Sequence, residues 1–220
     1  GEHRGIKHLV VDEMQDYTWV QYLLLKKLFP CRMTIMGDRA QTMEDRQQDV
    51  LTFLPEIFGR DIRVIYMNRS YRNTVEIARY ANRIAGITDM ELFERHGAEV
   101  REESFCSTEE ALARVSETWL RDQERLETAA VIFLTEKEAR EAAECFMSEA
   151  GDGKDRISYM DRNSQSFQRG LTVTTFYLAK GLEFDRVYGI FSADDQAPLV
   201  RQAKYITATR ALHELMMYSV

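Results

Sequence analysis

Short apolar runs alternate with longer amphipathic stretches along most of the chain. The first run, at 8–11 (HLVV), is valine-rich, as in a buried parallel strand, and apolar residues at helical spacing follow it. The pattern predicts strands at seven places: 8–11, 33–36, 62–67, 129–134, 171–175, 187–191 and 215–220. Strands that alternate with helices in this way predict an α/β fold, in which helices cover both faces of a parallel sheet.

Capping signals mark four of the helix starts. At each, a Ser, Thr or Asn precedes a Glu or Gln by three residues, a pairing that satisfies backbone N–H groups at the start of a helix. The pairs are Thr18 with Gln21, Asn73 with Glu76, Ser107 with Glu110, and Thr135 with Glu138. Two further helices are predicted at 50–54, where Pro55 interrupts the pattern, and at 201–212. One face of the first helix carries Val20, Leu23, Leu24 and Leu28.

Domain organisation follows from the same pattern, because the strand and helix units become more regular after residue 60. We expect a partial first lobe at 1–60 and a complete second lobe at 61–220. The chain begins with Gly1 rather than methionine, and an apolar strand follows within a few residues. It is therefore expected to be a piece of a longer protein.

Composition narrows the class of partner. The 220 residues carry a formal net charge of −7, which argues against a broad basic surface for nucleic acid and leaves a narrow basic groove open. No run is long enough to span a membrane, and no signal peptide opens the chain. Cys31, Cys106 and Cys145 are scattered without metal-ligand spacing. They indicate reduced core thiols, and we expect a cytoplasmic protein with no membrane partner.

The strongest chemical signal follows the first predicted strand, where the sequence reads Asp12-Glu13-Met14-Gln15-Asp16. Ligands of open parallel sheets collect at the carboxyl ends of strands. An acidic pair there can hold hydrated Mg²⁺ through one carboxylate while the other polarises a water. An isolated Asp-Glu pair is more often a solvated turn, but the full motif directly after an apolar strand favours a functional role.

This segment resembles the second motif, Asp-Glu-x-Gln-Asp, of superfamily-1 helicases of the UvrD/Rep type. Four more motifs follow in the family's order. Gly37-Asp38-Arg39-Ala40-Gln41 is similar to the third motif, Gly-Asp-x-x-Gln. Ser70-Tyr71-Arg72-Asn73 is similar to the fourth, Asn-Tyr-Arg-Ser, with different residues at its two ends.

Segment 172–185 (TVTTFYLAKGLEFD) resembles the fifth motif, Thr-x-His-x-x-Lys-Gly-Leu-Glu-Phe-Asp, with Tyr177 in place of the histidine. Segment 205–212 (YITATRAL) resembles the sixth, Tyr-Val-Ala-x-Thr-Arg-Ala, without the acidic residues that usually precede it. The resemblance covers nearly the whole chain. The short second lobe and the Ser-Tyr-Arg-Asn variant of the fourth motif resemble the helicase-IV-like branch of the family. It implies a RecA-like second motor lobe of the P-loop NTPase type plus a partial first lobe, with ATP and Mg²⁺ as cofactors.

The resemblance also implies a role for each matching residue. Asp12 would hold Mg²⁺, and Glu13 would be the general base. Three residues would sense the γ-phosphate: Gln41, Arg72 and Arg210. Arginine suits this task because its planar fork donates to two phosphate oxygens and stays charged.

The remaining matches concern the nucleoside and the nucleic acid. Glu183 would contact the ribose, and Gln15 and Gly181 would also belong to the nucleotide site. The residues expected near single-stranded DNA are Thr174, Thr175 and Tyr177.

Two departures from the family limit what the chain is expected to do alone. The phosphate loop Gly-x-x-x-x-Gly-Lys-Thr/Ser is absent, so the β- and γ-phosphates have no cradle. We therefore expect weak ATP binding and no hydrolysis without an upstream lobe of the parent chain that carries this loop. Glu44 stands about where the family has an aromatic residue that stacks on a base, and a carboxylate there would repel phosphate.

No large accessory insertion separates the fourth and fifth motifs.

Three functional hypotheses remain. The leading one is an ATP-dependent DNA helicase or translocase acting on single-stranded DNA. The second is an ATP-driven remodelling factor for a protein partner such as RNA polymerase, with little unwinding, which Glu44 and the acidic charge favour. The third is a non-catalytic helicase-like lobe. Intact acidic, glutamine and arginine positions argue against the third, because a retired ATPase has no chemical need for them.

Overall fold

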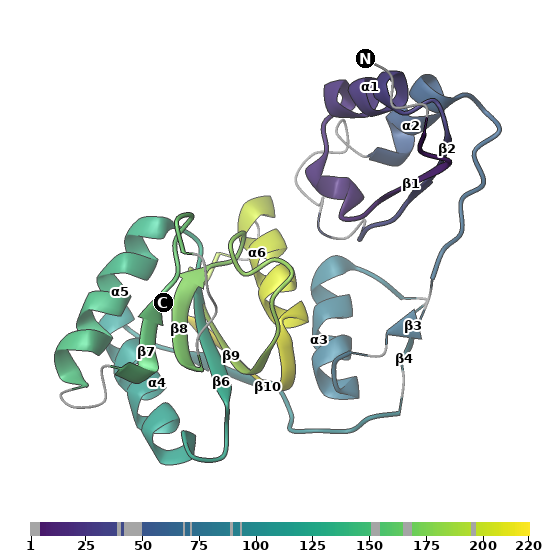
Figure 1. The fold of residues 1–220 in the computed structure, drawn as a ribbon. Coiled ribbons are helices and arrows are strands. Elements are labelled where there is room, and N and C mark those ends of the chain that lie inside the picture. Colours follow the sequence, from purple (N-terminus) through teal and green to yellow (C-terminus); the bar gives the residue numbers. More distant parts are fainter. Residues whose placement is uncertain are drawn as a thin grey trace. The chain divides into compact units, whose positions relative to one another are not determined.

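The computed structural model describes residues 5–38, 41, 50–67, 69–70, 72–88, 90–92, 94–150, 155–164, 169–194 and 197–220. The chain divides into two compact units, Gly1–Met67 and Asn68–Val220 (Figure 1). The domain boundary predicted near residue 60 precedes this division by a few residues. No helix in the described ranges is both long and apolar enough to cross a membrane.

The first unit is a small α/β body. Its elements in chain order are β1 (His8–Val11), a short 3₁₀ helix (Met14–Asp16), α1 (Trp19–Leu28), β2 (Arg32–Ile35) and α2 (Val50–Phe58). The strands pair in parallel, from His8 opposite Arg32 to Val11 opposite Ile35. Both helices contribute to a core formed by Val11, Met14, Tyr22, Val50, Leu54 and Ile57.

Much apolar surface of this unit faces solvent. The predicted apolar face of α1 is exposed, because the buried side chain of this helix is Tyr22 instead. The predicted strand at 62–67 is wrong: these residues form no ladder, and Val64, Ile65, Tyr66 and Met67 are exposed, Met67 to 81%. A strand is defined by its hydrogen-bonded neighbour, and the described residues provide none here.

The second unit holds the remaining elements. They are β3 (Arg69–Ser70), α3 (Val75–Ala85), β4 (Glu91–Leu92), β5 (Arg101–Ser104), α4 (Thr108–Asp122), β6 (Thr128–Phe133), α5 (Glu136–Glu149), β7 (Ile157–Tyr159), β8 (Gly170–Thr175), β9 (Phe184–Phe191), α6 (Pro198–Thr209) and β10 (Ala211–Ser219). Its main sheet has six strands in the order β5-β10-β9-β6-β8-β7, and every pair is parallel. β3 and β4 pair separately.

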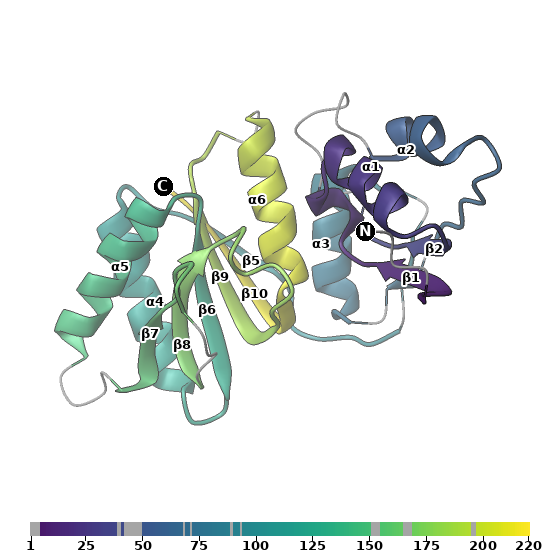
Figure 2. The ribbon, with the colours of Figure 1, turned by 45° about the horizontal axis from the view of Figure 1, so that its top comes forward.

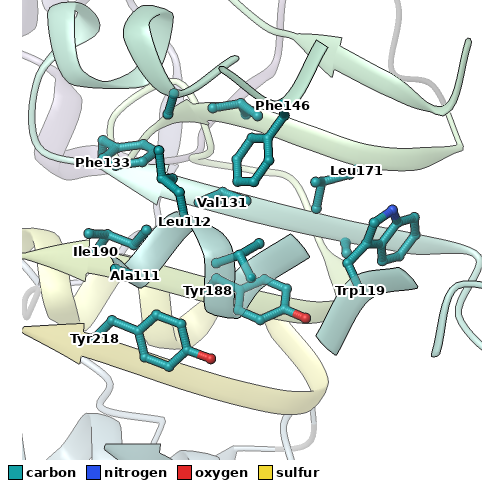
Figure 3. Packing of buried hydrophobic residues seen from close by; sticks show 14 of the residues in the cluster. Ala111, Leu112, Trp119, Val131, Phe133, Phe146, Leu171, Tyr188, Ile190 and Tyr218 are labelled. Carbon is teal, nitrogen blue, oxygen red and sulfur yellow. The ribbon is translucent and has the colours of Figure 1, made fainter. Parts of the chain in front are cut away.

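Helices cover both faces of this sheet. α4 and α5 lie on one face, and α6, with α3 packed against it, lies on the other (Figures 1 and 2). The core on the α4–α5 face is built from both helices and the central strands (Figure 3), and includes Trp119, Val131, Phe133, Phe146, Leu171 and Tyr188. The predicted fold class, a parallel α/β sheet with helices on both faces, is confirmed.

Most of the other element predictions agree with the structure, with the following corrections. The helix predicted at 201–212 is α6, which ends at Thr209, and Ala211 already belongs to β10. Thr74 rather than Asn73 caps α3, and its side chain accepts from the amide of Ile77. α2 continues through Pro55 to Phe58, because the burial of Leu54 and Ile57 on one face outweighs the local preference. The edge strands β5 and β7 escaped prediction, since β5 has the polar sequence REES and β7 only three residues.

The cysteines form no disulfide, but they are not core residues. Cys106 is exposed, and Cys31 and Cys145 are half-buried. Burial of the Cys145 thiol raises its pKa.

A buried arginine joins α4 to two central strands. Arg186 of β9 donates to the carboxylates of Asp122, at 2.6 Å, and Glu214, at 2.7 Å. It also donates to the carbonyl of Thr118 and the hydroxyl of Tyr188, at 3.2 and 3.1 Å. Its side chain is 2% exposed, and the more exposed Arg125 pairs with the same two carboxylates, at 2.6 Å from Glu214 and 3.8 Å from Asp122.

We expect Arg186→Met to destabilise the second unit by about 3 kcal/mol, because it leaves two poorly solvated carboxylates with only the more exposed Arg121 and Arg125 as cationic partners. Urea unfolding followed by Trp119 fluorescence, in a Trp19→Phe background, measures the change. The control is Lys137→Met, which removes an exposed pair with Glu141 and should cost less than about 0.5 kcal/mol. Equal effects of the two substitutions would contradict the prediction.

Candidate functional site

In the first unit, the predicted acidic pair lies at the carboxyl end of β1. Glu13 has φ of 51°, the one positive value for a non-glycine among the described residues. Its amide donates to the Asp12 carboxylate at 2.8 Å. Asp12 is exposed, whereas Glu13 is half-buried. Such backbone strain persists only where surrounding contacts enforce it, and here it directs two adjacent carboxylates differently.

Gln15 provides those contacts. Its side-chain amide donates to the Glu13 carboxylate and, at 3.4 Å, to the side-chain oxygen of Gln41. Its own side-chain oxygen accepts from the amide of Asp38 at 3.1 Å. Gln41 in turn donates to the Asp38 carboxylate at 3.2 Å and is 6% exposed. One glutamine therefore connects the segments after β1 and β2.

Gly37 makes this close approach of the two segments feasible. A Cβ at this position would lie 2.6 Å from the backbone nitrogen of Met14 and would also collide with the Gln15 side chain. The amide of Met14 donates to the carbonyl of Met36 at 2.8 Å, which holds the two turns together. Beneath them the hydroxyl of Tyr22 donates to the carbonyl of Met14, and burial raises the pKa of this tyrosine to about 12.

In the second unit, three predicted nucleotide residues meet. The guanidinium of Arg72 forms an ion pair with Glu183 at 2.8 Å. Arg210, which is 4% exposed, donates to the carbonyl of Leu182 at 3.3 Å. The amide of Phe184 donates to the carbonyl of Arg210 at 2.9 Å. Glu183 therefore lies between two residues that bond to Arg210.

The position of this group on the sheet differs from the expectation. Glu183 and Arg210 directly precede β9 and β10, whose first residues pair with each other, so both lie at the amino ends of these strands. In the first unit the predicted site residues follow the carboxyl ends of β1 and β2, as expected, whereas here they precede the strands. The reason is that residues 176–183 carry the chain from the carboxyl end of β8 back to the amino end of β9.

The predicted nucleic-acid residues lie at the opposite edge, at the end of β8. Thr174 and Thr175 are buried; the Thr174 hydroxyl donates to the carbonyl of Met160, and the Thr175 hydroxyl has no partner among the described residues. Tyr177 is half-buried and donates to Glu136 at 2.6 Å. Tyr177 is thus the one member of this set with surface to offer a ligand.

Two residues around Tyr177 carried no sequence signal. Arg162 lies over its ring, 5.7 Å from the centroid, and pairs with Glu136 at 3.1 Å. The hydrogen bond with Tyr177 and the charge of Glu136 raise the pKa of Arg162. These residues follow β7 and begin α5, and tertiary folding alone brings them to the end of β8.

The last acid of the fifth motif has a structural task. The carboxylate of Asp185 accepts from the amides of Glu127 and Thr128, each at 3.0 Å. It therefore fixes the start of β6 against β9. Gly181, at φ of 79°, forms the turn before Glu183, a conformation that favours glycine. Other predicted positions lie outside the described residues: Arg39, Ala40, Glu44 and Tyr71.

The residues present fit part of the implied cofactor set. An exposed carboxylate such as that of Asp12 suits Mg²⁺, which uses one or two protein carboxylates and takes its remaining ligands from water and phosphate. The described residues contain no group of three or more His, Cys, Asp or Glu that could form a complete protein metal site. The printed sequence offers no glycine-rich loop to surround the phosphates.

No family model matches the sequence, and no curated protein does. Among the solved structures that resemble it is the C-terminal domain of a possible DNA helicase from Lactobacillus plantarum WCFS1. The TM-score is 0.53 at 23% identity, and the match covers 69% of this chain and 88% of that one. The fold of this chain resembles that of this C-terminal domain. At this identity the likeness establishes the fold alone.

Gly37→Ala should loosen the first-unit site, because the added methyl group displaces the Gln15 side chain and the Met14 backbone. We expect a loss of about 1–3 kcal/mol, as for overpacking elsewhere. Faster hydrogen exchange at 11–15 and 35–38, read by mass spectrometry, checks this. Gly5→Ala is the control, since nothing lies within 4 Å of its Cβ position. Unchanged exchange in the Gly37 variant would show that the turns tolerate a side chain.

Proposed function

We propose that this sequence is the C-terminal portion of an ATP-dependent DNA helicase or translocase that acts on single-stranded DNA. The convergence of Arg72, Glu183 and Arg210 carries the proposal. Each residue was assigned to a nucleotide from a different motif, and folding places all three at one edge of the second unit. A helicase-like fold supports the proposal, and the motif set favours a superfamily-1 protein of the UvrD/Rep or helicase-IV-like type.

The first unit supplies the hydrolytic groups in this proposal. Bound Mg²⁺ would neutralise charge on the phosphates, and Asp12 is the carboxylate that would hold it. Glu13 would accept the proton of the attacking water. The contact with Gln15 orients this carboxylate, and Gln15 also reaches Gln41, which would respond to the γ-phosphate. The Gln15 side chain therefore links Gln41, which would respond to the γ-phosphate, to the proposed general base Glu13.

The phosphates also need a cradle, and we propose that an upstream lobe of the parent chain supplies it. The open surface of the first unit supports this idea. Its sheet has two described strands, and Val10, Trp19, Val20 and Leu24 are each at least 45% exposed. Apolar surface of this extent normally marks an interface. The 220-residue chain alone should therefore bind ATP weakly and not hydrolyse it.

Contact with DNA is assigned to Tyr177 and its surroundings at the carboxyl end of β8. The connection 176–183 runs from this tyrosine to Glu183, so one short segment spans the distance between the proposed DNA contact and the proposed ribose contact. Thr174 and Thr175 are buried, so they would support the DNA contact from below the surface rather than touch the strand themselves. Tyrosine can stack on bases of any sequence, which suits a translocase.

The alternative function is an ATP-driven remodelling factor for a protein such as RNA polymerase. The net charge of −7 favours it, because strong attraction of the nucleic-acid backbone calls for positive charge. Both functions share the same ATP site and differ in what stimulates it.

Steady-state ATP hydrolysis by the parent protein that contains this chain (the full-length polypeptide), with and without single-stranded DNA, tests the proposal. We expect DNA to raise the rate many-fold, and Glu13→Gln to lower it by roughly 10²-fold or more through loss of the general base. Glu56→Gln is the matched control, because Glu56 is an exposed residue of α2 in the same unit. The control should hydrolyse ATP like the unmodified protein.

Hydrolysis that needs Glu13 but ignores DNA would support the protein-directed alternative. Hydrolysis unaffected by Glu13→Gln would overturn the assignment of the base. Absence of hydrolysis in the full-length polypeptide, under all these conditions, would overturn the motor proposal as a whole.

A further inference from the structure

Asn73 joins two distant parts of the second unit. It lies next to Arg72 and just before the Thr74 cap of α3. Its side-chain amide donates to the carbonyl of Ala211 at 2.6 Å and approaches the carbonyl of Thr209 at 3.5 Å. Asn73 therefore does not cap α3, as the sequence pattern predicted. Its side chain instead bonds to Ala211, which lies 138 residues later in the sequence.

The two carbonyls are those on either side of Arg210. Thr209 ends α6, so its carbonyl has no partner within the helix and needs another donor. Ala211 begins β10. The Arg210 side chain donates to the Thr209 hydroxyl at 3.1 and 3.3 Å, in addition to its bond with the carbonyl of Leu182. Asn73 therefore fixes the backbone from which the Arg210 side chain starts.

These contacts form a closed chain of interactions that connects the proposed nucleotide residues. Arg72 is next to Asn73, Asn73 bonds beside Arg210, and Arg210 bonds to the residues on both sides of Glu183. Glu183 forms an ion pair with Arg72, which closes this chain of interactions. The Arg72 side chain is 64% exposed, so its guanidinium can still reach a ligand.

We propose that Asn73 is a positioning residue that sets Arg72 and Arg210 relative to one another for a γ-phosphate; this inference rests on the proposed function. An asparagine amide carries two N–H donors and can serve two carbonyls. Serine would bring one donor on a shorter side chain, and aspartate would bring none at neutral pH. The residue type therefore matters, and not only its size.

The test measures how strongly the full-length polypeptide prefers a non-hydrolysable ATP analogue over ADP, as the ratio of the two dissociation constants. Asn73→Asp keeps the size of the side chain but removes both donors and sets a carboxylate against two carbonyl oxygens. We expect it to reduce the preference roughly tenfold while ADP binding stays the same, because only the analogue carries the third phosphate. Asn73→Ser, which keeps one donor, should restore part of the preference.

The control is Asn82→Ala in α3, the helix that follows Asn73. Asn82 is half-buried like Asn73, but none of the described contacts involves its side chain. It should keep the preference of the unmodified protein. Melting temperatures of all variants are measured in parallel.

An Asn73→Asp variant that keeps the full preference overturns the inference, and so does one that loses affinity for both nucleotides equally, since a merely structural role would do that. Failure of the proposed function looks different. In that case the unmodified protein itself shows no preference for the analogue, and the positioning role of Asn73 falls with it.

Discussion

The parallel direction of every strand pair in the main sheet controls where this chain can place functional groups. Each connection has to return from one edge of the sheet to the other, so a motif that follows one strand can end at the start of the next. Residues 176–183 do this without a regular helix, which leaves Tyr177 at the carboxyl edge and Glu183 at the amino edge. A proposed DNA contact and a proposed nucleotide contact thus share one segment but not one location.

The amino edge is then held from both faces of the sheet. On the α4 side, Arg186 compensates Asp122 and Glu214, which fixes the start of β9 against β10. On the α3–α6 side, Asn73 satisfies carbonyls at the end of α6 and the start of β10. Ends of helices and strands leave backbone groups without regular partners, and side chains that satisfy these groups also fix the geometry of neighbouring arginines.

Local signals predicted much of the fold because the interactions involved are short in sequence. Ser107 and Thr135 cap their helices as expected, and the apolar strands β6, β8 and β9 lie in the sheet core. The prediction failed where a neighbour distant in sequence decides the outcome. Residues 62–67 have strand-like composition but no partner strand among the described residues, whereas polar β5 is a strand because β10 lies beside it.

The sequence by itself predicted which residues are candidates for chemistry and in which order they occur, because motif spacing is a local property. It also predicted a parallel α/β fold. Only the tertiary structure decided that Arg72, Glu183 and Arg210 meet at the amino edge, that Asn73 bonds to α6 and β10 rather than capping α3, and that Thr174 and Thr175 are buried. The physical reason is that these outcomes depend on strand order and register, which bring together segments more than a hundred residues apart.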